Sequence, residues 1–218
     1  MKSRYGDKFN HDDEAHEYDA HVLQEEIPYR AGYAQLLGWV AGQVNARPCR
    51  RVLDLGTGTG NLANLIQAGE IVGVDNSGKM LAIAREKLGG RNCELIQTDL
   101  LQYFESPPQP FDAIVSTYTV HHLTPEEKRI LFQACHEALH PAGIMVFGDL
   151  MFPTEEEQQR INARYRTEGL SPMVDEAEDE YYWIHDRDLA VLRELGYEVD
   201  LKQFSTLAWT VLVERGTA

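Results

Sequence analysis

Positive charge is scarce in this sequence of 218 residues, which holds 20 Lys and Arg against 35 Asp and Glu and has a formal net charge of −15. The few cations form no cluster along the chain. Proteins that bind nucleic acid neutralise phosphates with a concentrated basic surface. The charge balance therefore argues against a nucleic-acid partner.

Cysteines and long apolar runs are also few. The three cysteines, Cys49, Cys93 and Cys135, lie far apart, which does not suggest a disulfide framework or a Cys-x-x-Cys metal site. No stretch approaches the ~20 apolar residues of a membrane helix, and the N-terminal stretch has no apolar run typical of a signal peptide. We therefore expect a cytoplasmic protein that does not associate with membranes.

Short apolar runs alternate with helical patterns along the chain. Apolar runs without polar alternation indicate strands buried on both faces, as helices covering a parallel sheet produce. The pattern predicts an α/β fold, Rossmann-like and doubly wound, with a mostly parallel seven-stranded sheet. The expected strands are residues 51–55, 71–75, 93–97, 112–116 and 143–147, followed by an antiparallel pair at 197–203 and 207–214.

Capping residues mark several helices. Ser77 is placed to cap one helix, and Thr124 and Thr154 each precede a Glu by three residues, as in a capping box. The expected helices cover residues 61–67, 78–88, 124–140, a stretch after 154, and 186–195, whereas residues 171–183 look irregular. We expect one domain with four parts: a helical cap (1–46), a cofactor-binding core (47–150), an acidic helical insertion or lid (151–184), and a C-terminal helix with the strand pair (185–218).

The acidity is concentrated in two segments. Residues 7–26 carry a charge of −7 and residues 155–180 carry −6. One interpretation is that both are solvated helical faces. The other is that they form a cap that repels polyanions and tolerates a neutral or cationic small acceptor.

A glycine-rich loop, VLDLGTGTG at residues 52–60, ends a strand and opens a helix. Glycine permits sharp turns and close approach of a ligand to the backbone, and a helix N-terminus offers unpaired N–H groups. A tight turn required only for packing is the simpler explanation. A dinucleotide-binding GxGxxG loop needs glycine where Asn61 stands, so the spacing disfavours a nicotinamide-dependent enzyme.

Acidic residues belong to the first three expected strands or directly follow them. Asp54 lies two residues before the first glycine of the loop, Asp75 ends the second strand, and Asp99 follows the third. Because the carboxyl ends of parallel strands meet at one edge of a sheet, these side chains are expected around one crevice. Asp75 is placed to accept both ribose hydroxyls of an adenosine, and Asp99 to bind the adenine amine.

Together these segments resemble the motifs of class I S-adenosylmethionine-dependent methyltransferases. VLDLGTGTG looks like the first motif, GVD the second, TDL the third, FDAIVSTYTVHHL the fourth, and LHPAGIMVFGD the strand and turn after it. Within that class, the HHLT, IPYRAGY and FSTLAWTVLVER segments are similar to small bacterial methyltransferases of the YrrT type.

The resemblance implies S-adenosylmethionine as cofactor and a role for each matching residue. The implied contacts are Gly56, Thr57, Gly58 and Gly60 around the methionine moiety, Asp54 at its ammonium with Ser116 nearby, Asp75 at the ribose, Asn76 and Met80 on the two faces of the adenine, Asp99 and Leu100 at its edge, and Tyr18 as a cover.

Methyl transfer from a sulfonium needs alignment and exclusion of water rather than a nucleophilic triad. A base helps when the acceptor carries a proton, and His121 and His122 lie just after the fourth strand, where the resemblance places substrate-facing residues. The alternative is that one caps the following helix and the other is solvated. No metal is expected, because the five-residue spacing of His11, His16 and His21 does not place them on one helical face.

The expected function is methyl transfer to a small-molecule acceptor by a monomer or homodimer. The fourth strand ends in STYT, not in the Asn/Asp-Pro-Pro-aromatic sequence that resembling enzymes use on amide or adenine nitrogens, which disfavours such targets. Three alternatives remain: a cofactor-binding protein without catalysis, an RNA methyltransferase, and a nicotinamide-dependent oxidoreductase.

Overall fold

The computed structural model describes residues 1–4, 6, 8, 12, 15–106, 108–177 and 180–216. His11 lies outside this described part. The elements run in the order α1 (Tyr18–His21), α2 (Tyr33–Asn45), β1 (Arg51–Leu55), α3 (Asn61–Leu65), β2 (Glu70–Asp75), α4 (Gly78–Lys87), β3 (Cys93–Gln97), α5 (Leu100–Tyr103), β4 (Phe111–Thr117), η1 (Val120–His122, a 3-10 turn), α6 (Pro125–Ala138), β5 (Leu139–Phe152), α7 (Glu155–Thr167), α8 (Ser171–Ala177), β6 (Trp183–Ile184), α9 (His185–Glu194), β7 (Tyr197–Gln203) and β8 (Ala208–Arg215).

The strands form one sheet in the order β3-β2-β1-β4-β5-β8-β7, with β6 paired to β5 beside this path. β1 pairs in parallel with both β2 and β4, and β8 runs antiparallel to both β5 and β7. The predicted doubly wound, mostly parallel sheet with a closing antiparallel pair is confirmed. The two-residue strand β6 was not predicted from the sequence.

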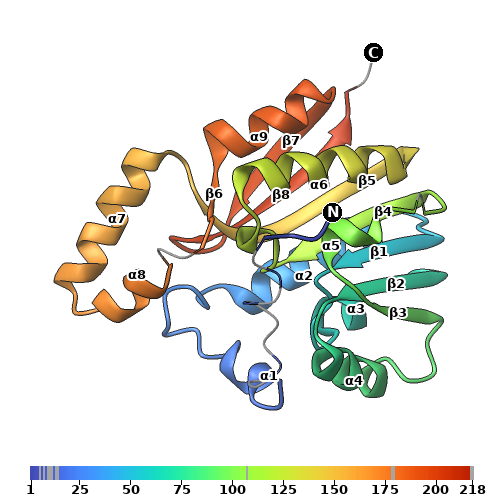
Figure 1. The fold of residues 1–218 in the computed structure, drawn as a ribbon, viewed down its shortest axis with the longest axis horizontal. Coiled ribbons are helices and arrows are strands. Elements are labelled where there is room, and N and C mark those ends of the chain that lie inside the picture. The colour runs from blue at the N-terminus through green and yellow to red at the C-terminus, as the bar shows by residue number, and fades with distance from the viewer. Residues whose placement is uncertain are drawn as a thin grey trace.

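Helices cover both faces of the sheet (Figure 1). Alternate residues of β1 point to opposite sides, so Val52 belongs to the core cluster under α2, α3 and α4, and Leu53 to the cluster under α5, α6 and α9. The strand order reverses between β1 and β4, the place where doubly wound sheets open a crevice.

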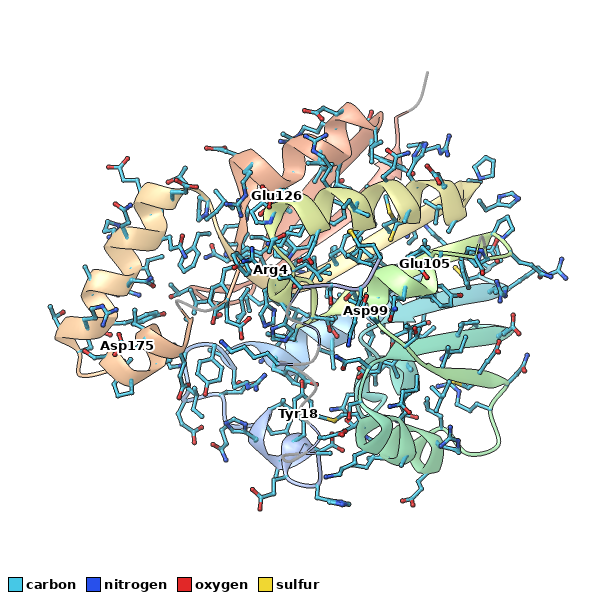
Figure 2. All side chains as sticks on the ribbon, viewed as in Figure 1. Arg4, Tyr18, Asp99, Glu105, Glu126 and Asp175 are labelled. Atoms are coloured by element: carbon cyan, nitrogen blue, oxygen red, sulfur yellow. The ribbon has the colours of Figure 1, made fainter. Side chains whose placement is uncertain are left out.

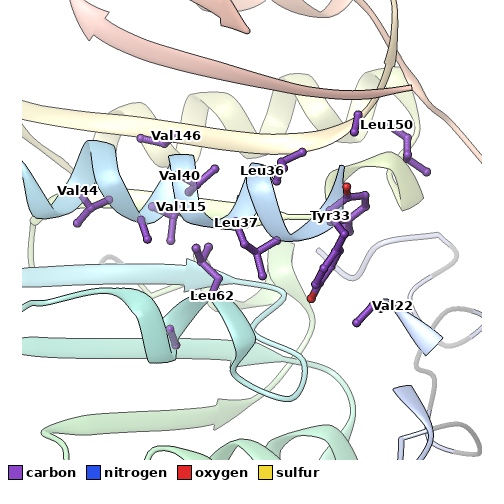
Figure 3. Packing of buried hydrophobic residues seen from close by; sticks show 14 of the residues in the cluster. Val22, Tyr33, Leu36, Leu37, Val40, Val44, Leu62, Val115, Val146 and Leu150 are labelled. Atoms are coloured by element: carbon purple, nitrogen blue, oxygen red, sulfur yellow. The ribbon is translucent and has the colours of Figure 1, made fainter. Parts of the chain in front are cut away.

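Helix α2, which the sequence analysis assigned to the N-terminal cap, packs on the sheet. Figure 3 shows its Leu36, Val40 and Val44 turned toward the strands that carry Val115 and Val146. These α2 side chains recur at helical spacing and are fully buried, so burial of this stripe holds the helix in the core. The covering part of the N-terminal region is therefore the chain before α2.

Several predicted elements differ from the structure. Helix α6 ends at Ala138 rather than near residue 140, and β5 continues directly from Leu139. The segment expected to be irregular contains α8, whose Val174 is buried. The predicted caps are confirmed: Ser77 accepts a hydrogen bond from the Met80 N–H, and Thr124 forms a capping box with Glu127.

Helices α7 and α8 extend away from the sheet beside the segment that carries α1 (Figure 1). Ile161 and Val174 of these helices share one apolar cluster with Val22, which follows α1. The two acidic segments of the sequence therefore bury apolar side chains in the same core cluster. None of the described helices combines the length and the apolar character needed to cross a membrane.

Candidate functional site

A cavity of about 900 Å³, partly open to solvent, lies where the glycine-rich loop meets the ends of β2, β3 and β4. We call it the edge cavity. The N-terminal segment, α1, the start of α2 and η1 complete its wall. Ten of the residues predicted for the site line it: Tyr18, Gly56, Thr57, Gly58, Asp75, Asn76, Met80, Asp99, Leu100 and His122.

The glycine-rich loop shapes one side of the edge cavity. Gly56 has a φ of +71°, and a Cβ there would stand 2.1 Å from the Thr119 hydroxyl oxygen. Gly58 has a φ of +53°, and no atom lies within 4 Å of the position that its Cβ would take. Gly56 is thus needed for packing, whereas Gly58 leaves room for a ligand against the backbone.

Asp75 connects this loop to the end of β2. Its carboxylate accepts hydrogen bonds from the Gly58 N–H at 2.8 Å and from the Ser77 N–H at 2.9 Å. Backbone donors thereby fix the carboxylate at the wall of the edge cavity.

Asp54 lies behind the loop and does not line the edge cavity. Its side chain is buried, and its Oδ2 atom has no hydrogen-bond partner. Burial raises the pKa of this carboxyl to about 7, because the charged form loses its hydration. An unpaired buried carboxylate oxygen fits a cationic ligand group that reaches it past the loop, directly or through water.

Asp99 follows β3 and caps α5, where its Oδ1 atom accepts the Leu101 N–H at 2.9 Å. The N-terminal segment also contacts it, since the Ser3 N–H donates to Oδ1 at 3.1 Å and the Ser3 hydroxyl donates to Oδ2. Figure 2 labels Asp99 and also Arg4, the residue after Ser3 in this segment. An adenine amine at Asp99 would thus share the carboxylate with Ser3 or displace it.

Two other predicted cofactor residues also lie outside the lining. A Cβ on Gly60 would stand 3.3 Å from Ala84 in α4. The Ser116 hydroxyl donates to the Leu55 carbonyl at 2.7 Å. In this structure both residues serve the packing of the strand ends.

Tyrosines surround the end of the edge cavity away from Asp99. Tyr18, Tyr33 and Tyr118 all line it, and the rings of Tyr33 and Tyr118 lie 5.2 Å apart. Tyr118 is the only residue other than glycine with a positive φ (+49°) in the part of the chain that the structure describes. This strained backbone turns its ring toward Tyr33.

Helix α1 is tied to the glycine-rich loop by Asp19. The Asp19 carboxylate accepts hydrogen bonds from the Thr59 hydroxyl at 2.6 Å and from the Lys87 ammonium at 2.7 Å. Although burial opposes it, the Lys87 hydrogen bond helps to lower the pKa of Asp19. Tyr18, next in sequence, is thereby held over the cavity.

The two candidate histidines occupy different environments. His121 is buried and does not line the edge cavity; its Nδ1 lies 2.5 Å from Asp149 Oδ1. Asp149 also accepts the Trp183 indole N–H at 3.0 Å. Burial alone would lower the pKa of His121, but the Asp149 carboxylate outweighs it and raises the pKa. His121 is therefore held as part of a buried ion pair.

His122 lines the edge cavity, and its Nδ1 lies 2.7 Å from Glu180 Oε2. Burial raises the pKa of Glu180, but the His122 hydrogen bond outweighs it and keeps the pKa below its usual range. Because a carboxylate only accepts hydrogen bonds, Nδ1 carries the proton, and Nε2 is the acceptor atom of the neutral ring.

The side chains of the two histidines and Glu180 lie close enough together to bind a metal cation. His121, His122 and Glu180 each offer a ligand atom, and the three atoms lie within 4.8 Å of one another; they are the one such group in the described residues. Both imidazoles already have carboxylate partners. The prediction that the protein uses no metal stays untested.

Several lining residues were missed by the sequence analysis, among them Ser3, Tyr33, Asn61 and Thr119. Asn61 directly follows the glycine-rich loop, and Thr119 belongs to the STYT segment. Their positions beside these two motifs could have indicated both residues. Ser3 and Tyr33 reach the site only through the path of the N-terminal region, which no local pattern reports.

Comparison with known proteins agrees with this geometry. A family described as a methyltransferase domain matches residues 52–143. An uncharacterized methyltransferase of Oceanobacillus iheyensis is 34% identical over 203 residues, which are 91% of this chain and 92% of the relative. One from Geobacillus kaustophilus is 35% identical over 205 residues, 90% of this chain and 91% of the relative. The chain belongs to this methyltransferase family.

Solved structures support the fold of this methyltransferase. A complex described as DhpI-SAM-HEP superposes with a TM-score of 0.71 at 19% identity and covers 96% of both chains. Magnesium protoporphyrin IX methyltransferase from Synechocystis PCC 6803 superposes with a TM-score of 0.66 at 16% identity, over 97% of this chain and 95% of that one. The resemblance to class I methyltransferases is confirmed, whereas the closer likeness to the YrrT type stays a prediction.

Proposed function

We propose that this methyltransferase transfers a methyl group from S-adenosylmethionine to a small-molecule acceptor and releases S-adenosylhomocysteine. The observation that carries the proposal is Gly58, whose left-handed backbone faces the edge cavity with open space where a Cβ would be. The DhpI-SAM-HEP complex and the protoporphyrin methyltransferase with bound SAM support the choice of cofactor.

The chain offers a complementary group to each part of this cofactor. Asp75 would accept the ribose hydroxyls, since backbone N–H groups already fix its carboxylate at the cavity wall. The backbone of Gly56 and Gly58 would lie along the methionine moiety. The unpaired Oδ2 of Asp54 would compensate the ammonium charge.

His122 is the residue best placed to accept a proton. When bound, the cofactor supplies a methyl group on sulfur that is already activated for displacement. Glu180 holds the Nδ1 proton of His122, so Nε2 can take the proton of an acceptor hydroxyl, amine or thiol as that atom attacks the methyl group. The buried His121–Asp149 pair supports the turn that presents His122.

A transfer assay with labelled methyl donor tests this function. The purified protein is incubated with a small-molecule extract in one arm and with total RNA in the other. We expect label in the small-molecule arm alone. Label in RNA would favour an RNA methyltransferase, and tight binding of S-adenosylhomocysteine with no transfer in either arm would favour a binding protein without catalysis.

A further inference from the structure

An arginine beside the tyrosine end of the edge cavity has no acidic partner. Within the described residues no carboxylate forms a salt bridge with Arg30, and its Nε atom is buried without a hydrogen-bond acceptor. Buried guanidinium donors without acceptors are costly. Arg30 is therefore available to an anion that the protein itself does not provide.

Two tyrosine rings flank this arginine, and one of them, Tyr18, lines the cavity. Its guanidinium carbon lies 5.7 Å from the ring centre of Tyr18 and 5.1 Å from that of Tyr29. Burial raises the pKa of the Tyr33 and Tyr118 hydroxyls, and the charge of Arg30 is close enough to oppose that rise. Arg30 thus lies behind Tyr18, within electrostatic reach of the cavity.

Tyr118 supplies a second unpartnered group. Its side chain is 93% buried, given a relative exposure of 7%, and its hydroxyl has no hydrogen-bond partner although the residue lines the cavity. Its left-handed backbone (φ +49°) is held by a hydrogen bond from the Tyr118 N–H to the Gly148 carbonyl at 2.8 Å. A protonated phenol in this position is a ready donor to a ligand oxygen.

The segment that carries Arg30 is held in place. The Arg30 N–H donates to the Ile27 carbonyl at 2.8 Å, and the Tyr33 N–H donates to the Arg30 carbonyl at 3.0 Å. Gly32 follows with a φ of +82°, and a Cβ there would stand 3.0 Å from Phe204. The backbone of the turn that carries Arg30 is therefore fixed next to the start of α2.

We propose that the methyl acceptor carries an oxyanion, a carboxylate or a phosphoryl group, which binds Arg30 and the Tyr118 hydroxyl. This inference rests on the proposed function and names the substrate class for the same cavity. A planar guanidinium matches such a group with two parallel hydrogen bonds. An anionic acceptor replaces the neutral or cationic acceptor that the acidic cap suggested. The acidic exterior disfavours polyanions, whereas the half-buried Arg30 selects one small anion.

The test divides a small-molecule extract by anion exchange before the labelled transfer assay. We expect label in the retained pool. Treatment of that pool with phosphatase before the transfer assay separates the two sources: a phosphate monoester loses its phosphate and is no longer labelled, whereas a carboxylate acceptor is still labelled. Label confined to the unretained pool would overturn the inference while leaving the proposed function intact. Absence of label in both pools would overturn the proposed function, and this inference with it.

Variants locate the anion within the protein. When the retained pool is limiting, Arg30→Gln should lower the rate of methyl transfer at least tenfold, and Arg30→Lys should lower it less. Both variants should bind S-adenosylhomocysteine with wild-type affinity. The matched control is Arg47→Gln, because Arg47 pairs with Glu214 at 2.6 Å and does not line the cavity. An Arg30→Gln protein that binds S-adenosylhomocysteine and keeps the wild-type rate would contradict the assignment.

Discussion

The two ends of the edge cavity are built in different ways. The end proposed for S-adenosylmethionine, which we call the cofactor end, contains Asp75 and Asp99. Backbone N–H groups from the same turn or from a neighbouring turn fix both carboxylates. The tyrosine end is the one proposed for the methyl acceptor, and we call it the acceptor end. There, Tyr118 and Arg30 come from segments far apart in sequence and hold polar atoms without partners. The first end is preorganised by local structure, whereas the second leaves groups unsatisfied that a ligand can satisfy. This difference is expected where one ligand is common to a family and the other is particular to its member.

The largest predicted effect tests the cofactor end. Gly58→Val should weaken binding of S-adenosylhomocysteine about 100-fold or more, because the side chain would fill the open space beside the loop. Gly169→Val is the matched control, since Gly169 has a φ of +86° and open space around its Cβ position but does not line the cavity. Calorimetry on both variants separates a blocked site from backbone strain. Wild-type affinity in Gly58→Val would mean that the cofactor lies elsewhere.

The next effect concerns the acceptor end alone. His122→Gln should lower kcat about 100-fold, the scale of general base catalysis, without changing the affinity for S-adenosylhomocysteine. His136→Gln serves as control, because the His136 ring contacts the Tyr197 hydroxyl at 2.9 Å away from the cavity. If His122→Gln lost cofactor affinity and kept kcat, the assignment of the two ends would be reversed.

A smaller loss is expected at the ribose position. Asp75→Ala should weaken cofactor binding by about 1.5 to 3 kcal/mol, or about tenfold to a hundredfold, the scale of charge-assisted hydrogen bonds. Asp112→Ala is a close control, because Asp112 also accepts two backbone N–H groups, from Arg50 at 2.8 Å and Arg51 at 3.0 Å. Equal losses in both variants would point to general destabilisation instead of a ribose contact.

The last prediction concerns stability, with the smallest expected effect on cofactor binding. The Asp54 carboxyl ionises near pH 7 in the folded protein and near pH 4 when unfolded, so the folded state holds the extra proton between these values. The free energy of unfolding should therefore fall as pH rises from about 4 to 7, by on the order of 3 to 4 kcal/mol. Asp54→Asn should flatten this dependence and bind the cofactor more weakly. An equally steep pH profile in Asp54→Asn, measured by urea unfolding, would refute the assignment.

Much of the cofactor end could be predicted because its information is local. The loop at residues 52–60, with Asp75 and Asp99 at strand ends, needs only the periodicity of strands and the rule that parallel strands share a carboxyl edge. Asp54 was placed correctly at the end of β1, but its side chain points behind the loop, out of the lining. Spacing along a strand predicts the position of a residue in the sheet. The path of the glycine-rich loop determines which groups the Asp54 side chain can reach.

The contacts that the N-terminal region makes at both ends of the cavity could not be predicted in the same way. Ser3 meets Asp99 across 96 residues, and Arg30 is surrounded by rings contributed from the cap. Such contacts follow from how the cap and the insertion pack on each other, through apolar residues such as Val22 and Val174, and they leave no periodic trace in the sequence. His121 and His122 were predicted only in part. Their position after the fourth strand was predictable, but the sequence did not indicate that His121 is buried and that His122 faces the cavity.

Calorimetric titration of the wild-type protein with S-adenosylhomocysteine and, separately, with NADH tests most directly whether the edge cavity is a methyl-donor site. The structure of the glycine-rich loop and the position of Asp75 predict one equivalent of S-adenosylhomocysteine bound with micromolar Kd and no heat with NADH. Micromolar binding of NADH with no binding of S-adenosylhomocysteine would contradict it.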